Sequence, residues 1–262
     1  GQIALYTDGG AILVDGPAAE LGFSPASDTV PEMSLSGGGL SGLTINDISV
    51  TGRAISGGTL AANFDTRDNA AVSAQGELDA VARDLIERFE TATLDPTTAA
   101  GEPGLFTDAG VSFDPANETG LANRLRLNDL VDPSEAGESW PLRAGLGATA
   151  PGESGDARQL QAFSAILQEA RATGSSVFGT ELSSAADIAS DLTSRVAQNS
   201  DRANGTLTFA SVNQTEMARI EAEQGVDTDA ELQQLMIVER AYAANARMIQ
   251  TIDEMMETLL RL

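Results

Sequence analysis

The last part of the chain carries its most regular hydrophobic pattern. Apolar side chains recur there at alternating steps of three and four residues over more than three heptads. This spacing is typical of a coiled-coil seam, because heptad positions a and d lie on one face of a helix. A helix from Thr228 to Leu262 would be about 50 Å long at 1.5 Å per residue. The predicted seam consists of Leu235, Val238, Tyr242, Asn245, Ile249, Ile252, Met256 and Leu259.

This seam predicts association with other subunits. Burying a large apolar side chain contributes about 1.5 to 3 kcal/mol, whereas ordering one backbone residue costs about 1 to 2 kcal/mol, so the helix alone is marginal in water. Asn245 contributes little stability at a seam position but fixes the register of identical helices. We therefore expect the eight seam residues to form an assembly interface between copies of the chain.

A second long helix is expected upstream of the seam. Ser184-Ala-Ala-Asp187 predicts its start and Gly225 its end, while Gly205 costs about 1 kcal/mol relative to alanine and predicts a local bend or break. Thr228-Asp-Ala-Glu231 is a second capping box, in which side chains and backbone exchange hydrogen bonds. The two helices are expected to form an antiparallel hairpin that turns near residue 225. The first helix carries Ile188, Leu192, Val196, Ala203, Leu207, Ala210, Met217 and Ile220 along its length.

The first third of the chain has the pattern of strands and turns. Residues 2–14 place two apolar runs around Asp8-Gly9-Gly10, which predicts a β-hairpin. Residues 17–31 read as a loop and residues 34–42, SLSGGGLSG, as a turn cluster. The glycines lack the Gly-Lys-Ser/Thr of a P-loop, so a structural turn is expected. Residues 43–50, LTINDISV, alternate as one further strand.

The middle of the chain changes to a helical period from Asn69 onward. Apolar residues from Leu78 to Phe89 predict a core-facing helix and leave Glu77, Asp84, Glu87 and Arg88 in water. The expected apolar face consists of Leu78, Val81, Ala82, Leu85, Ile86 and Phe89.

A further helix is predicted after a long loop at residues 93–120. Asp156-Ala-Arg-Gln159 matches a capping box, and the helix is expected to end near Gly174. Trp140, which precedes it, is interpreted as a core or lid residue rather than a ligand platform. The apolar stripe of this helix is Leu160, Phe163, Ile166, Leu167 and Ala170.

These patterns predict an α+β chain with three parts. They are a β-rich outer portion at residues 1–66, a helical middle domain with long loops at 67–175, and a helical hairpin at 176–262 that ends in the coiled-coil helix.

Charge and composition exclude several functions. The chain has 39 acidic residues against 15 arginines and no lysine, with a net charge of -24. Nucleic acids and anionic lipids would repel such a surface, so neither is an expected partner. The absence of histidine and cysteine excludes imidazole bases, thiol nucleophiles and the metal sites built on them. No apolar run is long enough for membrane insertion. We expect no cofactor.

Two acidic features were weighed as sites. Asp95, Glu102, Asp108 and Asp114 lie in one loop region, but the spacing of a calcium-binding EF-hand is absent, so a solvated loop is expected. Asp253, Glu254 and Glu257 fall outside the seam, where solvated charges are expected rather than a catalytic pair. The sequence therefore predicts no metal site and no catalytic residue.

Three segments resemble a known family. The terminal ELQQLMIVERAYAANARMIQTIDEMMETLLRL is similar to the C-terminal helix of flagellar axial proteins. Upstream, GGTLAANFDTRDNAAVSAQGELDAVARDLIERF and GEPGLFTD resemble segments of the flagellar hook-associated protein 1 family. The resemblance covers residues 57–110 and 227–262, and the chain corresponds to the C-terminal portion of such a protein. Because Gly1 is not a methionine, we expect a fragment or a processed product.

The resemblance implies a non-enzymatic structural protein at the hook–filament junction. It implies export through the flagellar secretion system to an extracellular position. It also implies four kinds of partner: other copies of the chain, the hook protein, the second junction protein and, before assembly, an export chaperone.

Two alternatives from other classes remain open at this point. One is a carboxylate-based cell-wall hydrolase that uses two of the acids. The other is an adhesin-like binding module on residues 1–66, which predicts a concave apolar site, whereas the junction interpretation predicts a shape without a pocket.

Overall fold

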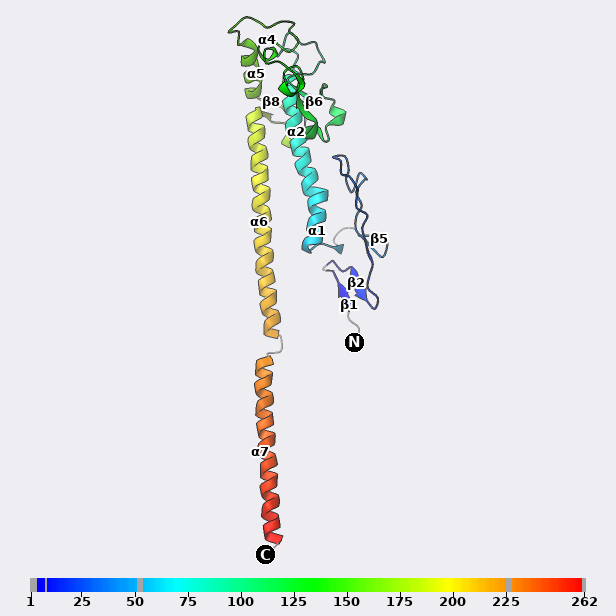
Figure 1. Ribbon diagram of the computed structural model, residues 1–262, viewed down its shortest axis with the longest axis vertical. Helices are drawn as coiled ribbons and strands as arrows, with labels where there is room; N and C mark the ends of the chain where they lie inside the picture. Colours follow the sequence, from blue (N-terminus) through cyan, green and yellow to red (C-terminus); the bar gives the residue numbers. More distant parts are fainter. Residues whose placement is uncertain (1–3, 8, 51–53, 225–227, 261–262) are drawn as a thin grey trace. The chain divides into compact units, whose positions relative to one another are not determined.

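The computed structural model describes residues 4–7, 9–50, 54–224 and 228–260. Near the end of the chain, the described side chains are those of residues 232–248 and 250. The chain divides into two compact units, Gly1–Val196 and Ala197–Leu262 (Figure 1). Helices and small antiparallel sheets are compatible with the α+β class, while the three-part division stays a prediction.

The β-hairpin expected at the start of unit 1 is confirmed. Strand β1 (Ala4–Tyr6) pairs antiparallel with β2 (Ile12–Asp15). Gly10 has a φ of 84°, a conformation that glycine adopts without steric cost.

The prediction of one strand at residues 43–50 is wrong, because the segment folds back on itself. Strand β4 (Thr44–Ile45) pairs with β5 (Ile48–Ser49) on one side and with β3 (Leu21–Gly22) on the other. The turn residues Asn46 and Asp47 have φ angles of 50° and 62°. Two consecutive positive φ values are the requirement of a two-residue type I′ turn, and Asn and Asp tolerate them well.

The first helix begins at Gly58 rather than at Asn69. Helix α1 (Gly58–Asp65) continues through a π-helical turn, η2 (Thr66–Ala70), into α2 (Ala71–Phe89). No side chain caps α1. Its tertiary contacts stabilise it instead: the Phe64 ring packs edge-on against Phe23 at 5.7 Å, and Arg67 Nη1 donates to Ser41 O at 3.0 Å.

The largest core cluster of unit 1 forms around the end of α2. The Phe89 ring lies 5.1 Å from Phe106 and 5.3 Å from Phe163. A second cluster joins Ala82, Ile86 and Leu121. Leu78, expected in the core, is 48% exposed. The main cluster comprises Phe89, Leu94, Leu105, Val131, Leu146, Phe163 and Ile166.

The long loop after α2 contains short elements. Strand β6 (Phe106–Asp108) pairs antiparallel with β7 (Leu125–Leu127). Trp140 is half-buried, and its indole N–H donates to the Glu138 carboxylate, so it does not belong to the core clusters. The other elements are η3 (Pro115–Asn117), α3 (Leu121–Arg124), η4 (Pro133–Glu135) and α4 (Pro141–Ala144).

Helix α5 (Arg158–Gln168) begins where expected, but the predicted capping box and the predicted C-terminal end are wrong. The Gln159 amide donates to Leu94 O at 3.1 Å instead of closing a capping box with Asp156. The helix stops well before Gly174 because Glu169 is extended. The chain then forms β8 (Arg171–Ala172), η5 (Ser176–Phe178) and β9 (Leu182–Ser183), in which β8 and β9 pair antiparallel.

Helix α6 (Ala185–Gln224) starts at the predicted cap. Ser184 Oγ accepts from Asp187 N at 3.2 Å, and the Asp187 carboxylate accepts from Ser184 N at 3.0 Å. The helix runs through Gly205 without a break, so the expected interruption is absent. Helix α7 (Thr228–Leu260) follows. The predicted turn at Gly225 and the side chains of the second capping box lie outside the described residues.

Several acidic and basic side chains expected in water are buried. Asp84 is 3% exposed and Arg88 is completely buried. Asp95 and Asp108, expected in a solvated loop, are also buried. Each has hydrogen-bond partners, because a buried charge without them is too costly. Asp108, for example, accepts from Arg124 Nε at 2.7 Å.

Candidate assembly surface

Helix α7 exposes apolar side chains over its whole described length. All described side chains between 232 and 250 are exposed to solvent. Leu235, Val238 and Tyr242 are 69%, 59% and 77% exposed, and the side chain of Asn245 is exposed too. The other four predicted interface residues, Ile249, Ile252, Met256 and Leu259, belong to α7, but their side chains lie outside the described set.

The described seam residues share one face of α7. At 3.6 residues per turn, Leu235, Val238, Tyr242 and Asn245 fall within a sector of about 80°. The other sides of the helix carry polar or small side chains such as Gln233 and Ala243, but also the apolar Leu232 and Met236, which are 60% and 43% exposed. A helix that exposes this much apolar area needs a second surface to bury it.

The exposed apolar surface is wider than the predicted seam. Ile237 and Met248 are 65% and 63% exposed and extend the face on one side. The part of α6 in unit 2 also exposes Phe209 and Val212, at 69% and 62%. Sequence reasoning missed these four residues because it selected only strict heptad positions. A count of all apolar positions between 207 and 248 would have found them.

Exposed ion pairs accompany this apolar surface in unit 2. On α6, Arg219 pairs with Glu216 at 2.6 Å and also contacts Glu223. Such pairs on a helix surface contribute little to stability, because water and salt screen them. The described charges of unit 2 are thus available to solvent rather than fixed in a site.

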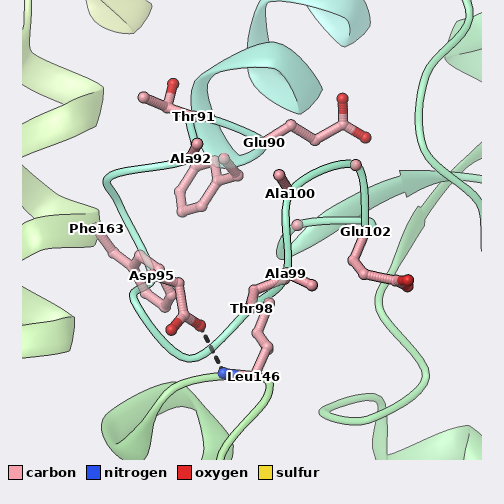
Figure 2. Close-up of a pocket in the computed structure, with 13 residues that line it drawn as sticks. Glu90, Thr91, Ala92, Asp95, Thr98, Ala99, Ala100, Glu102, Leu146 and Phe163 are labelled. Atoms are coloured by element: carbon pink, nitrogen blue, oxygen red, sulfur yellow. Dashed lines mark hydrogen bonds between the residues drawn. The ribbon is translucent and has the colours of Figure 1, made fainter.

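One pocket in unit 1 bears on the hydrolase alternative, because acidic side chains line it. It lies at the end of α2 and is lined by three acids, Glu90, Asp95 and Glu102, with Leu146 and Phe163 nearby. Figure 2 shows the Asp95 carboxylate turned toward Leu146 N, while Glu90 and Glu102 extend on the other side of the pocket. The space inside fits about one water molecule. A sugar ring needs far more room than this.

Asp95 holds the backbone around the pocket in place. Asp95 accepts hydrogen bonds from Thr97 N at 2.9 Å, Thr97 Oγ1 at 2.6 Å and Leu146 N at 2.6 Å. Burial raises the pKa of Asp95, but these hydrogen bonds outweigh it and keep the pKa below its ordinary value. Both carboxylate oxygens of Asp95 thus accept hydrogen bonds from the surrounding chain.

Glu90 is shifted in the other direction. Burial raises its pKa, against a hydrogen bond of 3.0 Å from Phe113 N, and the charge of Glu87 adds to the rise. The opposite shifts of Glu90 and Asp95 resemble those of an acid and a nucleophile in a glycosidase. The occupied oxygens of Asp95 and the small space do not support that chemistry here.

An apolar hollow in unit 1 bears on the binding-module alternative. It opens between α1 and the loop that precedes it. The expectation of a shape without a pocket is therefore wrong for this part of the chain. The hollow is lined by Leu35, Gly42, Leu43, Val50, Ile55, Ala61, Phe64 and Asp68.

Among the described residues, no group of three or more acidic side chains is placed to hold a metal ion. No described helix is long and apolar enough to cross a membrane.

Comparison with known proteins identifies one match. Residues 222–262 match the family model described as flagellar basal body rod FlgEFG protein C-terminal. No curated protein and no solved structure matches the chain. The matched residues contain all of α7. The match supports a structural component of the flagellum related to the axial proteins of the rod and hook, without singling out hook-associated protein 1.

Proposed function

We propose that this chain is a structural, non-enzymatic component of the hook–filament junction of the bacterial flagellum, of the hook-associated protein 1 type. The proposal depends on two features that occur together on α7. The helix matches an axial family, and its described apolar side chains are all exposed. An axial protein needs such a face to assemble.

The apolar face of α7 supplies the driving force for assembly. Leu235, Val238 and Tyr242 leave more than half of their surface exposed. Burying apolar area contributes about 25 cal/mol per Å², so each large side chain adds about 1.5 to 3 kcal/mol when a second copy covers it. Asn245 lies on the same face and would select one register among identical helices. The face therefore combines affinity with alignment.

The proposed partners follow from this role. Other copies of the chain cover the seam within one ring or helical turn. The hook protein and the second junction protein lie on either side of the assembled chain. Before assembly, an export chaperone covers the same exposed helix, and export leads to the extracellular part of the flagellum.

A double substitution tests the proposal. Val238→Asp with Tyr242→Asp places two charges on the apolar face, where burial in an assembly would cost several kcal/mol for each unpaired charge. Neither Val238 nor Tyr242 belongs to unit 1, so the fold of unit 1 should be unaffected. Secretion of the variant is measured alongside, because the proposed chaperone covers the same helix. Where the variant is secreted, we expect hooks without filaments and filament protein in the medium.

The matched control carries the same charges on the opposite side of α7. Gln233→Asp with Ala243→Asp adds two aspartates at exposed positions outside the seam. This variant is expected to build filaments. Normal filaments with Val238→Asp and Tyr242→Asp would contradict the proposal, as would an equal loss of filaments in both variants.

The apolar hollow favours a second function, a binding module in unit 1. An environment-sensitive apolar dye that binds at the hollow should be displaced by Ala61→Phe, which fills the space beside Phe64. Dye binding that is unchanged by Ala61→Phe would remove this alternative.

A further inference from the structure

Arg88 is the most deeply buried cation among the described residues. It lies in the last turn of α2, and none of its surface is exposed. Its Nε donates to Asp84 Oδ2 at 2.6 Å. This pair joins positions i and i+4 of one helix and holds the guanidinium in a fixed orientation.

The remaining donors of Arg88 reach two other parts of the chain. Nη1 donates to Ile166 O at 2.9 Å and to Glu169 O at 2.7 Å, at the C-terminal end of α5. The last carbonyl groups of a helix have no partner within the helix, so Arg88 supplies one. Nη2 donates to Ser183 O at 2.7 Å, in the residue just before the cap of α6.

Further contacts fix the first turns of α6 directly after Ser183, the residue that accepts from Arg88. Ser184 and Asp187 close the capping box directly after Ser183. Ile188 is 2% exposed, and Arg195 lies 5.5 Å above the Phe178 ring of η5. Between 197 and 223, every described side chain except that of Ile220 is exposed. We call residues 184–195 the root of α6.

A second arginine also links α2 to the segment that leads into the root. Arg171 of β8 pairs with Glu87 at 2.9 Å and approaches the free oxygen of Asp84 at 3.4 Å, which is an ion pair rather than a hydrogen bond. Because β8 pairs with β9, which ends at Ser183, this contact also fixes the segment that leads into α6. Two arginines thus join α2 to both ends of the segment 169–183.

We propose that Arg88 is a positioning residue that clamps the root of α6 to the end of α2 and sets the orientation of these first turns of α6 within unit 1. Arg88 donates to the backbone carbonyl groups of Ile166, Glu169 and Ser183. The clamp therefore depends on where the backbone runs and not on the side chains of these three residues. It is separate from the apolar core, in which Ile86 and Phe89 pack on other faces of α2.

The choice of a buried arginine supports a role in positioning. Removing two charges from water costs free energy that their attraction recovers only with good geometry, so a buried ion pair is weak evidence for stability alone. Four hydrogen bonds from one planar group instead define one arrangement of three segments. An apolar residue of similar size would fill the space without selecting that arrangement.

Hydrogen exchange of the full chain, at a concentration where it is monomeric, tests the clamp without reference to assembly. Arg88→Met alone leaves Asp84 buried beside one remaining cation and risks misfolding. The test variant is therefore Arg88→Met with Asp84→Leu, which replaces the pair by apolar side chains of similar size. We expect amides 184–195 to exchange about tenfold faster or more, while amides of α2 and of β6 keep their protection.

Two control variants are measured in the same way. Arg219→Met removes an exposed arginine of α6 and is expected to leave exchange in the root unchanged. Arg88→Lys keeps the charge and reaches fewer carbonyl groups, so it should restore only part of the protection. Unchanged exchange at 184–195 in the double variant would overturn the clamp. An equal increase in all amides of unit 1 would also overturn it, because the root would then open only with the whole unit.

Discussion

Arg88 of α2 is completely buried, whereas Tyr242 of α7 leaves 77% of its surface exposed. Most globular chains do the opposite with these residue types, because charges favour water and aromatic rings favour the interior. In unit 1, buried charges such as Asp79, Arg88 and Asp95 accept or donate several hydrogen bonds that fix loops and helix ends. In unit 2, exposed apolar side chains have no such role within the described chain. The difference teaches that unit 1 is specified by its own contacts, and it motivates our proposal that unit 2 buries its apolar surface against partners.

The largest expected effect is the loss of a buried acceptor in unit 1. Asp79 accepts from Gly120 N at 2.7 Å, Ala122 N at 2.8 Å and Gln75 Nε2 at 2.8 Å. Asp79→Ala should lower the free energy of unfolding of unit 1 by about 4 kcal/mol, because three donors lose their partner. Urea unfolding followed by the fluorescence of Trp140, the single tryptophan, measures this.

The corresponding change in unit 2 should have no measurable effect on the same transition. Glu216 pairs with Arg219 on the exposed surface of α6. If Glu216→Ala destabilised the chain as much as Asp79→Ala, the contrast between the two units would not hold.

An intermediate effect is expected from a matched pair of isoleucines. Ile86 is fully buried and Ile237 is 65% exposed. Ile86→Ala should cost about 3 kcal/mol, since it removes transfer free energy and leaves a cavity. Ile237→Ala should stay within about 0.5 kcal/mol in the monomer. Thermal unfolding of both variants gives the comparison, and equal losses would contradict it.

The smallest expected effect concerns Glu90. Its raised pKa means that the folded state binds a proton more tightly than the unfolded state, so stability falls as the pH rises from the ordinary pKa of 4.5 through the folded pKa. Glu90→Gln keeps an acceptor for Phe113 N and removes the charge. The variant should melt slightly above the parent at pH 7. The difference should disappear below the ordinary pKa of 4.5. A lower melting temperature at pH 7 would show that the charge is needed.

Local patterns predicted much of the secondary structure. The hairpin around Gly10 and the cap formed by Ser184 and Asp187 depend on residues close in the sequence, so their chemistry is visible there. The turn at Asn46 and Asp47 was equally visible, but alternation was given more weight than turn chemistry. The early start of α1 was not visible, because contacts of Phe64 and Arg67 with distant residues stabilise it.

The clamp could not be predicted from the sequence. Arg88 and Ser183 are 95 positions apart, and the acceptors are backbone carbonyls that any residue supplies. A helical wheel places Arg88 on the polar face, and only the path of α5 and β9 shows that this face is covered. The apolar face of α7 was predicted because helical spacing alone defines it, although its coverage by other copies stays a prediction.

Cysteine labelling tests the central claim most directly, because the chain contains no cysteine of its own. Single variants Val238→Cys and Gln233→Cys place one thiol on the apolar face of α7 and one on the opposite side. Reaction with a soluble maleimide is measured before and after assembly into flagella. In the free chain, both thiols should react at similar rates. After assembly, the thiol at 238 should react far more slowly than the thiol at 233. A thiol at 238 that reacts as fast in the assembled flagellum as in the free chain would contradict the account.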